Sequence, residues 1–283
     1  MKTNIIALTV AAALIPLTVF AGSEATKVSD NVIKKQRAML ENNTVSKGFG
    51  PQSPRDLSMK QGNNPRIFGL APESSNMNLC NIHMHKNAEH KGGEFSKYAG
   101  NGDGTGYQTG FVYTGKLSSK ETKSVNQDIC PNPHGGLFPG DTIEVHYVHS
   151  TAQAAPGNTL GACLGESTIN PQFRVETQVF VVVNDKDALD FGELTKHSIK
   201  NDKHQAPNIP NNTGTPIQYA GSTTGPSYNE KGSPFQVTWS VRPKVAKVNI
   251  ESVGQWCKGN AFKEDHAHGV RNLVVNPRLL SAM

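Results

Sequence analysis

The stretch Ile143-Glu144-Val145-His146-Tyr147-Val148-His149 alternates along its length, with apolar side chains between a carboxylate and an imidazole. Successive side chains of a β-strand point to opposite faces of a sheet. Glu144, His146 and Val148 would therefore share one face, and the apolar residues between them would share the other. The alternation predicts a strand that buries its apolar face and carries polar chemistry on the opposite one.

Other short apolar segments, bounded by turn-forming residues, are also typical of strands. From residue 48 onward the chain is rich in Gly, Pro, Asn and Ser, and the polar stretch 184–216 predicts loops with one short helix near residues 188–193. The pattern predicts a mainly β (α+β) fold with few helices. The expected strands cover residues 81–85, 110–113, 142–148, 177–183, 235–241 and 245–250.

The first residues follow the pattern of a secretory signal: Met1-Lys2, an apolar run over residues 5–20, and Ala21 at a small-residue cleavage point. The apolar run is too short for a convincing membrane span, and no cysteine at the cleavage point could accept a lipid. Residues 1–21 therefore predict an exported protein, periplasmic or secreted, with no stable membrane anchor.

Residues 22–47 are expected to form an N-terminal extension, in which Ser29-Asp30 would cap a short helix that reaches Asn42. The remaining residues, 48–283, are sufficient for one large domain with a substantial core.

The charge balance is mild, with 28 Lys and Arg residues against 23 Asp and Glu residues, and it disfavours a nucleic-acid partner. No feature of the sequence indicates an oligomeric state. The cysteines form no CxxC pair of the kind that binds zinc, so disulfides are expected in an oxidising compartment. The spacing of Cys80, Cys130, Cys163 and Cys257 favours none of the three possible pairings.

Histidines supply the main chemical clue, because five of the ten fall within residues 81–90 and 144–149. In a strand, His83 and His85 would point to one side, about 7 Å apart. His146 is the natural third ligand of a metal ion. Three neutral imidazoles that leave a fourth position for water make a catalytic zinc site. Asn81 and Glu144 could accept a hydrogen bond from the other ring N–H of these ligands and so fix their tautomers.

Five blocks of sequence, in order, resemble the carbonic anhydrases. The α class has an HxH strand preceded by an amide, a Glu-His pair, a Glu-Leu-His-Leu-Val-His strand, a Gly-Ser-Leu-Thr-Thr-Pro-Pro loop and a Val-Thr-Trp strand. The matching blocks here are Asn81-Ile82-His83-Met84-His85, Glu89-His90, Glu144-Val145-His146-Tyr147-Val148-His149, Gly221-Ser222-Thr223-Thr224-Gly225-Pro226 and Val237-Thr238-Trp239. The resemblance spans residues 50–242 and lies in these motifs.

Two departures separate the chain from the α class. About sixty residues separate His85 from His146, and the Asn-Gly-His segment that supplies the α-class proton shuttle is missing. The HxH motif, the nearby Glu-His pair and the long insertions look most like the δ class, which has bacterial members.

The resemblance implies a single domain built on a large, mostly antiparallel twisted sheet. It also implies zinc as the cofactor and the reversible hydration of carbon dioxide to bicarbonate and a proton, a lyase reaction. In carbonic anhydrases, zinc lowers the pKa of its bound water to about 7, and the hydroxide attacks carbon dioxide.

Further roles follow from the same resemblance. Thr224 matches the threonine that orients the zinc hydroxide and passes its own proton to a carboxylate, here Glu89. His90 and His149 are expected to be hydrogen-bonded structural residues. The apolar pocket for carbon dioxide would be walled by Val148, Thr223 and Trp239. No motif assigns the proton shuttle, for which the candidates are His134, His266 and His268.

Two other functions fit part of the pattern. HxH with Glu89 four residues later and a distant histidine is also the ligand pattern of cupin-type metal-dependent oxygenases, in which Glu89 would itself bind the metal. The cupin interpretation gives no role to the motifs at residues 221–226 and 237–239. An exported zinc-binding protein without enzymatic activity is expected to carry its histidines in flexible His-rich loops. These histidines instead fall on strand-like segments.

Overall fold

The computed structural model describes residues 27–223 and 229–282. The strands are β1 (Asn78–Lys86), β2 (Lys97–Asn101), β3 (Thr109–Val112), β4 (Thr142–Ser150), β5 (Phe173–Val183), β6 (Ser198–Lys200), β7 (Lys203–Gln205), β8 (Ile217–Gly221) and β9 (Val237–Asn249). The helices are α1 (Asp30–Thr44), α2 (Phe191–Leu194) and α3 (Ile250–Cys257), with short 3₁₀ turns η1 (Ser74–Asn76), η2 (Leu160–Cys163) and η3 (Pro277–Leu279).

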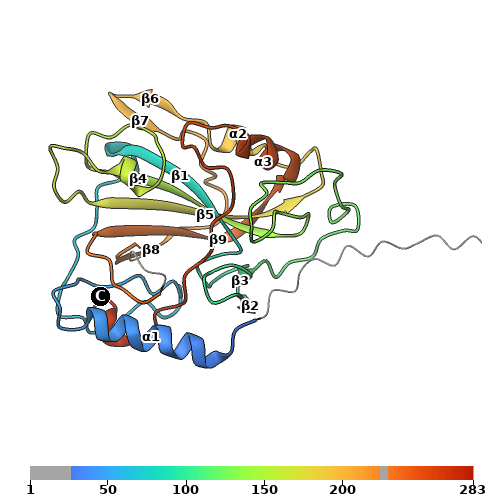
Figure 1. Cartoon of the computed structure of the whole chain (residues 1–283). Helices are drawn as coiled ribbons and strands as arrows, with labels where there is room; N and C mark the ends of the chain where they lie inside the picture. The colour runs from blue at the N-terminus through green and yellow to red at the C-terminus, as the bar shows by residue number, and fades with distance from the viewer. Residues whose placement is uncertain (1–26, 224–228, 283) are drawn as a thin grey trace, which may run out of the picture.

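A five-stranded sheet forms the centre of the molecule, in the order β1-β4-β5-β9-β8 (Figure 1). Three of its pairings are antiparallel, and the pairing of β5 with β9 is parallel. The expected mainly β fold with a mostly antiparallel sheet and few helices is confirmed. The short hairpins β2-β3 and β6-β7 stand apart from this sheet.

The two faces of the sheet bury different clusters. One cluster includes Val145 and Tyr147 of β4 and is covered by Phe191 of α2 and Trp256 of α3, which lie on one side of the sheet in Figure 1. The other face carries Val148, Trp239 and further apolar side chains, which pack against Phe95 and Phe111. The alternation along β4 therefore directs Glu144 and His146 to the second face, which is where the site lies.

Helix α1 lies on the opposite side of the sheet from α2 and α3, beside the C-terminal segment (Figure 1). Its Leu40 packs with Val274, Leu279 and Leu280. It extends two residues beyond the expected end at Asn42. Ser29 occupies the N-cap position, as expected, although its side chain makes no capping hydrogen bond.

The expected strands 235–241 and 245–250 form one strand, β9. Pro243 lies between them, and proline has no N–H to donate to a sheet ladder. The register with β5 shifts between Thr177 and Val179, so a bulge accommodates the proline without ending the strand. Residue 250 is not part of the strand, because the Asn249 side chain accepts a hydrogen bond from the Ser252 N–H and begins α3.

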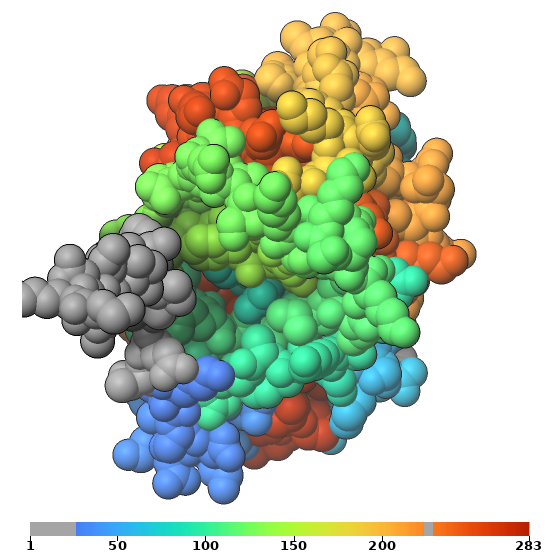
Figure 2. All heavy atoms as spheres, turned by 90° about the vertical axis from the view of Figure 1, so that its right-hand side faces the viewer, coloured from blue at the N-terminus to red at the C-terminus, as the bar shows by residue number. Residues whose placement is uncertain are grey.

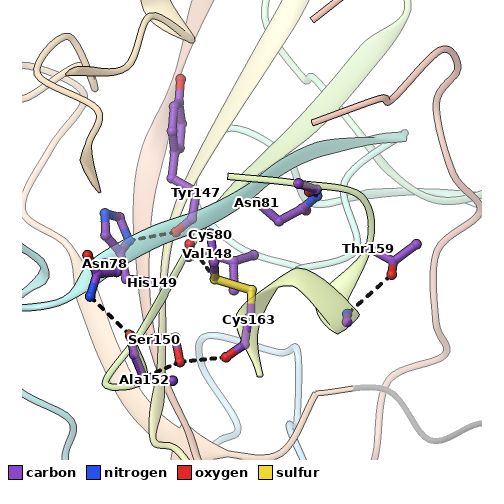
Figure 3. The surroundings of a disulfide bond; sticks show 12 residues. Asn78, Cys80, Asn81, Tyr147, Val148, His149, Ser150, Ala152, Thr159 and Cys163 are labelled. Atoms are coloured by element: carbon purple, nitrogen blue, oxygen red, sulfur yellow. Dashed lines mark hydrogen bonds between the residues drawn. A yellow bond between two sulfur atoms is a disulfide. The ribbon is translucent and has the colours of Figure 1, made fainter. Parts of the chain in front are cut away.

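Two disulfides join Cys80 to Cys163 and Cys130 to Cys257. The first ties β1 to η2, immediately beside Asn81 (Figure 3). The second anchors the long connection between β3 and β4 to α3; this connection, residues 113–141, lies at the right of Figure 1 and faces the viewer in Figure 2. Within the described ranges, no helix has the length and apolar character needed to cross a membrane.

Candidate metal centre

The pairing of β1 with β4 brings the three candidate ligands together. His83 lies directly opposite His146 in the antiparallel register, and His85 lies opposite Glu144. The ring centroids of His83, His85 and His146 are 4.7–5.1 Å apart. One nitrogen from each ring lies within 4.8 Å of the other two, so the three residues could hold a metal ion.

In each of these imidazoles, the ring nitrogen that points away from the other two rings lies beside a hydrogen-bond acceptor. His83 Nδ1 lies 2.6 Å from Asn81 Oδ1, and His146 Nε2 lies 2.6 Å from Glu144 Oε1. His85 Nδ1 lies 2.8 Å from the carbonyl oxygen of Gly269. Because these partners accept, each ring donates outward and keeps a lone pair on the nitrogen that faces the centre.

The central nitrogens fit a bound cation. His146 Nδ1 and His83 Nε2 lie 3.2 Å apart, and both carry lone pairs in the tautomers assigned above. Two ligand nitrogens on one tetrahedral zinc ion, at about 2.0–2.1 Å from the metal, are about 3.3 Å apart. Two lone pairs at this separation would repel each other without a positive ion between them.

The electrostatics keep the rings of His83 and His85 neutral. Burial, followed by the neighbouring His146, lowers the pKa of His85 to about 4, and the same two causes lower the pKa of His83 well below its usual value. A metal binds the unprotonated imidazole. The site is therefore ready to bind at neutral pH without first losing protons.

Glu144 is buried between two histidines. Its Oε1 lies 2.6 Å from His146 Nε2 and 2.7 Å from His90 Nδ1, and its Oε2 accepts the His90 backbone N–H. Burial alone would raise the pKa of Glu144, but the contacts with His90 and His146 hold it well below its usual value. His90 Nε2 lies 2.6 Å from the Tyr219 hydroxyl. His90 thus lies in a hydrogen-bonded network behind the three-histidine site.

Glu89 is also buried, and it lies outside the ligand groups found among the described residues. Its carboxylate accepts from Arg55 Nε at 2.8 Å and from the Arg271 N–H at 3.0 Å. Burial would raise the pKa of Glu89, but the Arg55 guanidinium and the neighbouring histidines lower it to about 2. Thr224, its expected partner, lies outside the described residues.

The three expected pocket residues lie on the site's side of the sheet or next to it. Val148 and Trp239 belong to the apolar cluster on that face, and the Trp239 ring centroid is 5.2 Å from that of His146. Thr223 is buried beyond the end of β8, with its hydroxyl 3.3 Å from the Ser233 hydroxyl.

The expected proton-shuttle candidates are placed very differently. The His268 ring lies 5.7 Å from that of His83 and 6.0 Å from that of His85, with its Nε2 2.6 Å from Glu264 Oε2. His266 pairs with the exposed Asp265. His134 is on the connection between β3 and β4, stacked on Tyr107 at 3.6 Å.

Sequence reasoning missed several contributors to the site. The Gly269 carbonyl has no signature, because any residue could supply it. Glu264, which contacts both Asn81 and His268, directly precedes the Asp265-His266-Ala267-His268 segment, and that proximity was the one available signal. Tyr219 and Arg55 carried no motif that connected them to His90 or Glu89.

Comparison with known proteins identifies the family. A family model for the delta carbonic anhydrases matches residues 74–252, which is well over half of the chain. The chain belongs to the δ carbonic anhydrase family. It is therefore a carbonic anhydrase, and the family implies carbon dioxide and bicarbonate as the substrate pair. Family membership also rules against the cupin interpretation.

Solved carbonic anhydrases show a distant likeness to this δ carbonic anhydrase. The α-carbonic anhydrase of Thermovibrio ammonificans, solved with the inhibitor sulfanilamide, has 16% identity, coverage of 79% of this chain and 84% of that one, and a TM-score of 0.28. The α-carbonic anhydrase of Photobacterium profundum has 16% identity, coverage of 81% and 88%, and a TM-score of 0.26. A hyperthermostable carbonic anhydrase from a hydrothermal vent chimney has 12% identity, coverage of 85% and 89%, and a TM-score of 0.27. No curated protein matches the chain.

Proposed function

We propose that this δ carbonic anhydrase hydrates carbon dioxide reversibly to bicarbonate and a proton, with zinc held by His83, His85 and His146. One observation carries the proposal: one nitrogen from each of the three imidazoles faces a common centre, and the opposite ring nitrogen lies beside a hydrogen-bond acceptor that fixes the tautomer. Three neutral imidazoles suit zinc and leave a fourth position open. When bound, zinc would act as a Lewis acid that lowers the pKa of water, to about 7 in known carbonic anhydrases.

The residues around the three histidines have separable roles in this proposal. Asn81 and Glu144 fix the tautomers of His83 and His146. Val148 and Trp239 offer an apolar wall to carbon dioxide, which needs contact area more than hydrogen bonds. Glu89 would accept a hydrogen bond from the Thr224 hydroxyl, a role that stays a prediction because Thr224 lies outside the described residues.

Metal removal and reconstitution test the proposal. Purified protein is stripped with a chelator, and carbon dioxide hydration is followed with a pH indicator before stripping, after it, and after zinc is added back. We expect activity to disappear with the metal and to return with about one zinc per chain. Activity that persists in metal-free protein would overturn the zinc assignment.

Among the three shuttle candidates, we propose His268 as the residue that carries the proton away. It is the candidate whose ring lies beside two of the ligand imidazoles, and its side chain is 35% exposed, so it can exchange protons with solvent. A histidine is the usual proton carrier near neutral pH.

Replacing His268 by alanine should lower the hydration rate about 10-fold or more in weak buffer, because the proton then has no carrier. Added imidazole should restore much of the rate. His134→Ala is the matched control, since His134 stacks on Tyr107 and has no contact with the three ligands. An unchanged rate for His268→Ala in weak buffer would exclude His268.

We also propose that the protein is exported and works in the periplasm or outside the cell. The two disulfides support an oxidising compartment. N-terminal sequencing of the protein recovered from periplasmic and culture fractions tests this; a chain that retains residues 1–21 in the cytoplasm would contradict it.

A further inference from the structure

Residues 260–269 form a loop that lies against the outer edge of β1. The His268 N–H donates to the Met84 carbonyl, and the Lys86 N–H donates to the His268 carbonyl, so the loop extends the ladder of the central sheet at this edge. Ala267 is buried in the core cluster. The loop is therefore held in place by its backbone and by packing, whatever side chain stands at position 264.

The side chain of Glu264 is directed inward from this loop and is 5% exposed. Its two oxygens have different partners. Oε1 accepts from Asn81 Nδ2 at 3.2 Å, and Oε2 lies 2.6 Å from His268 Nε2. A buried carboxylate needs such partners, because an unpaired one would be costly. Glu264 thus contacts both Asn81, which accepts from His83, and His268, whose ring lies near the ring of His83.

The contact with Asn81 determines how its amide is oriented. Asn81 Nδ2 donates to Glu264 Oε1 and to the Gly157 carbonyl at 2.9 Å, and both partners only accept. The amide oxygen must then face His83, whose Nδ1 is 2.6 Å away. His83 must donate from Nδ1, so the lone pair stays on Nε2. The opposite amide orientation would place oxygen against two acceptors.

We propose that Glu264 is a positioning residue of this metal centre. Through Asn81 it fixes the tautomer and orientation of His83, and through His268 it holds the imidazole beside the ligands. This role rests on the metal site proposed above. Groups behind a metal ligand typically change metal affinity or activity by about 10–100-fold when removed.

The primary test measures zinc, so that it does not depend on catalysis. Glu264→Ala should weaken zinc binding about 10-fold or more in competition with a chromophoric chelator. Glu264→Gln keeps an oxygen that can accept from Asn81 and should retain most of the affinity. The control is Asp265→Ala, which removes the neighbouring carboxylate; Asp265 is exposed and contacts His266, so zinc binding should not change.

A double-mutant cycle shows whether Glu264 acts through Asn81. The loss of zinc affinity caused by Glu264→Ala should shrink strongly in an Asn81→Ala background, because the intermediary is already absent. Near-ultraviolet circular dichroism checks that each variant is folded. The Asn260 side-chain amide holds the backbone of residue 264 by donating to the Glu264 carbonyl and accepting from the Glu264 N–H, and neither bond uses the Glu264 side chain.

Three results would overturn this role for Glu264: unchanged zinc affinity in Glu264→Ala, an equal loss in Glu264→Gln, or a full loss in the Asn81→Ala background. Failure of the proposed function looks different. In that case the wild-type protein itself would bind no zinc, or would bind zinc without hydrating carbon dioxide.

Discussion

His146→Ala is expected to lose both bound zinc and carbon dioxide hydration. His146 is the one ligand supplied by β4, and it lies directly opposite His83. Without it, two imidazoles on a single strand remain, and the buried Glu144 loses one of its two histidine partners. Zinc per chain after dialysis should fall close to zero, and hydration should fall to the uncatalysed rate.

A matched pair of variants separates the loss of a ligand from the loss of a buried imidazole. His149 lies on the same strand but points to the opposite face, with its Nδ1 3.1 Å from the Tyr147 carbonyl. His149→Gln should keep zinc and activity, whereas His146→Gln should lose both. Normal zinc content in His146→Gln would show that the ligand set is wrong.

Glu89→Gln is expected to destabilise the protein by about 3–5 kcal/mol, the range for breaking a buried ion pair by removing one partner. The Arg55 guanidinium would be left buried without its counter-charge. The hydration rate should also fall, because the acceptor proposed for Thr224 would be weakened. Urea unfolding of the metal-free protein measures the first effect.

The neighbouring pair Asp56–Lys91 provides the control, since its partners are 35 residues apart, against 34 for Arg55 and Glu89, and its lysine is 38% exposed. Asp56→Asn should cost about 1 kcal/mol or less, as for other partly exposed pairs. Equal costs for Glu89→Gln and Asp56→Asn would mean that burial of the Arg55–Glu89 pair has no energetic consequence.

The pH dependence of stability tests the same pair. The pKa of Glu89 falls from 4.5 to about 2 in the folded protein. A lowered pKa means that the ionised carboxylate stabilises the fold fully above about pH 4.5, and that this stabilisation is lost as the pH falls toward about 2. The difference in unfolding free energy between wild type and Glu89→Gln should therefore shrink across that window. A constant difference would contradict the assignment.

Which candidate ligands share a face of their strand could be predicted from sequence, because it follows from local geometry. A strand period of two places His83 with His85, and Glu144 with His146, without any knowledge of the sheet. The register that sets His83 against His146 could not be predicted, because it depends on the pairing of two segments about sixty residues apart. In place of the register, the order of the sequence motifs indicated that His146 belongs with His83 and His85.

The parts that sequence could not supply come from distant or irregular segments. The Gly269 carbonyl and the Glu264 carboxylate reach His85 and Asn81 from more than 180 residues away. The continuity of β9 across Pro243 depends on a bulge against β5, and a proline in isolation indicates a strand end. Long-range packing, rather than local propensity, decides each of these features.

The most direct test of the central claim is stopped-flow carbon dioxide hydration by purified protein with one zinc bound per chain. We predict catalysis that is lost in His146→Ala and is sensitive to removal of the metal. Protein with zinc fully bound to His83, His85 and His146 that hydrates carbon dioxide no faster than buffer would contradict the proposal.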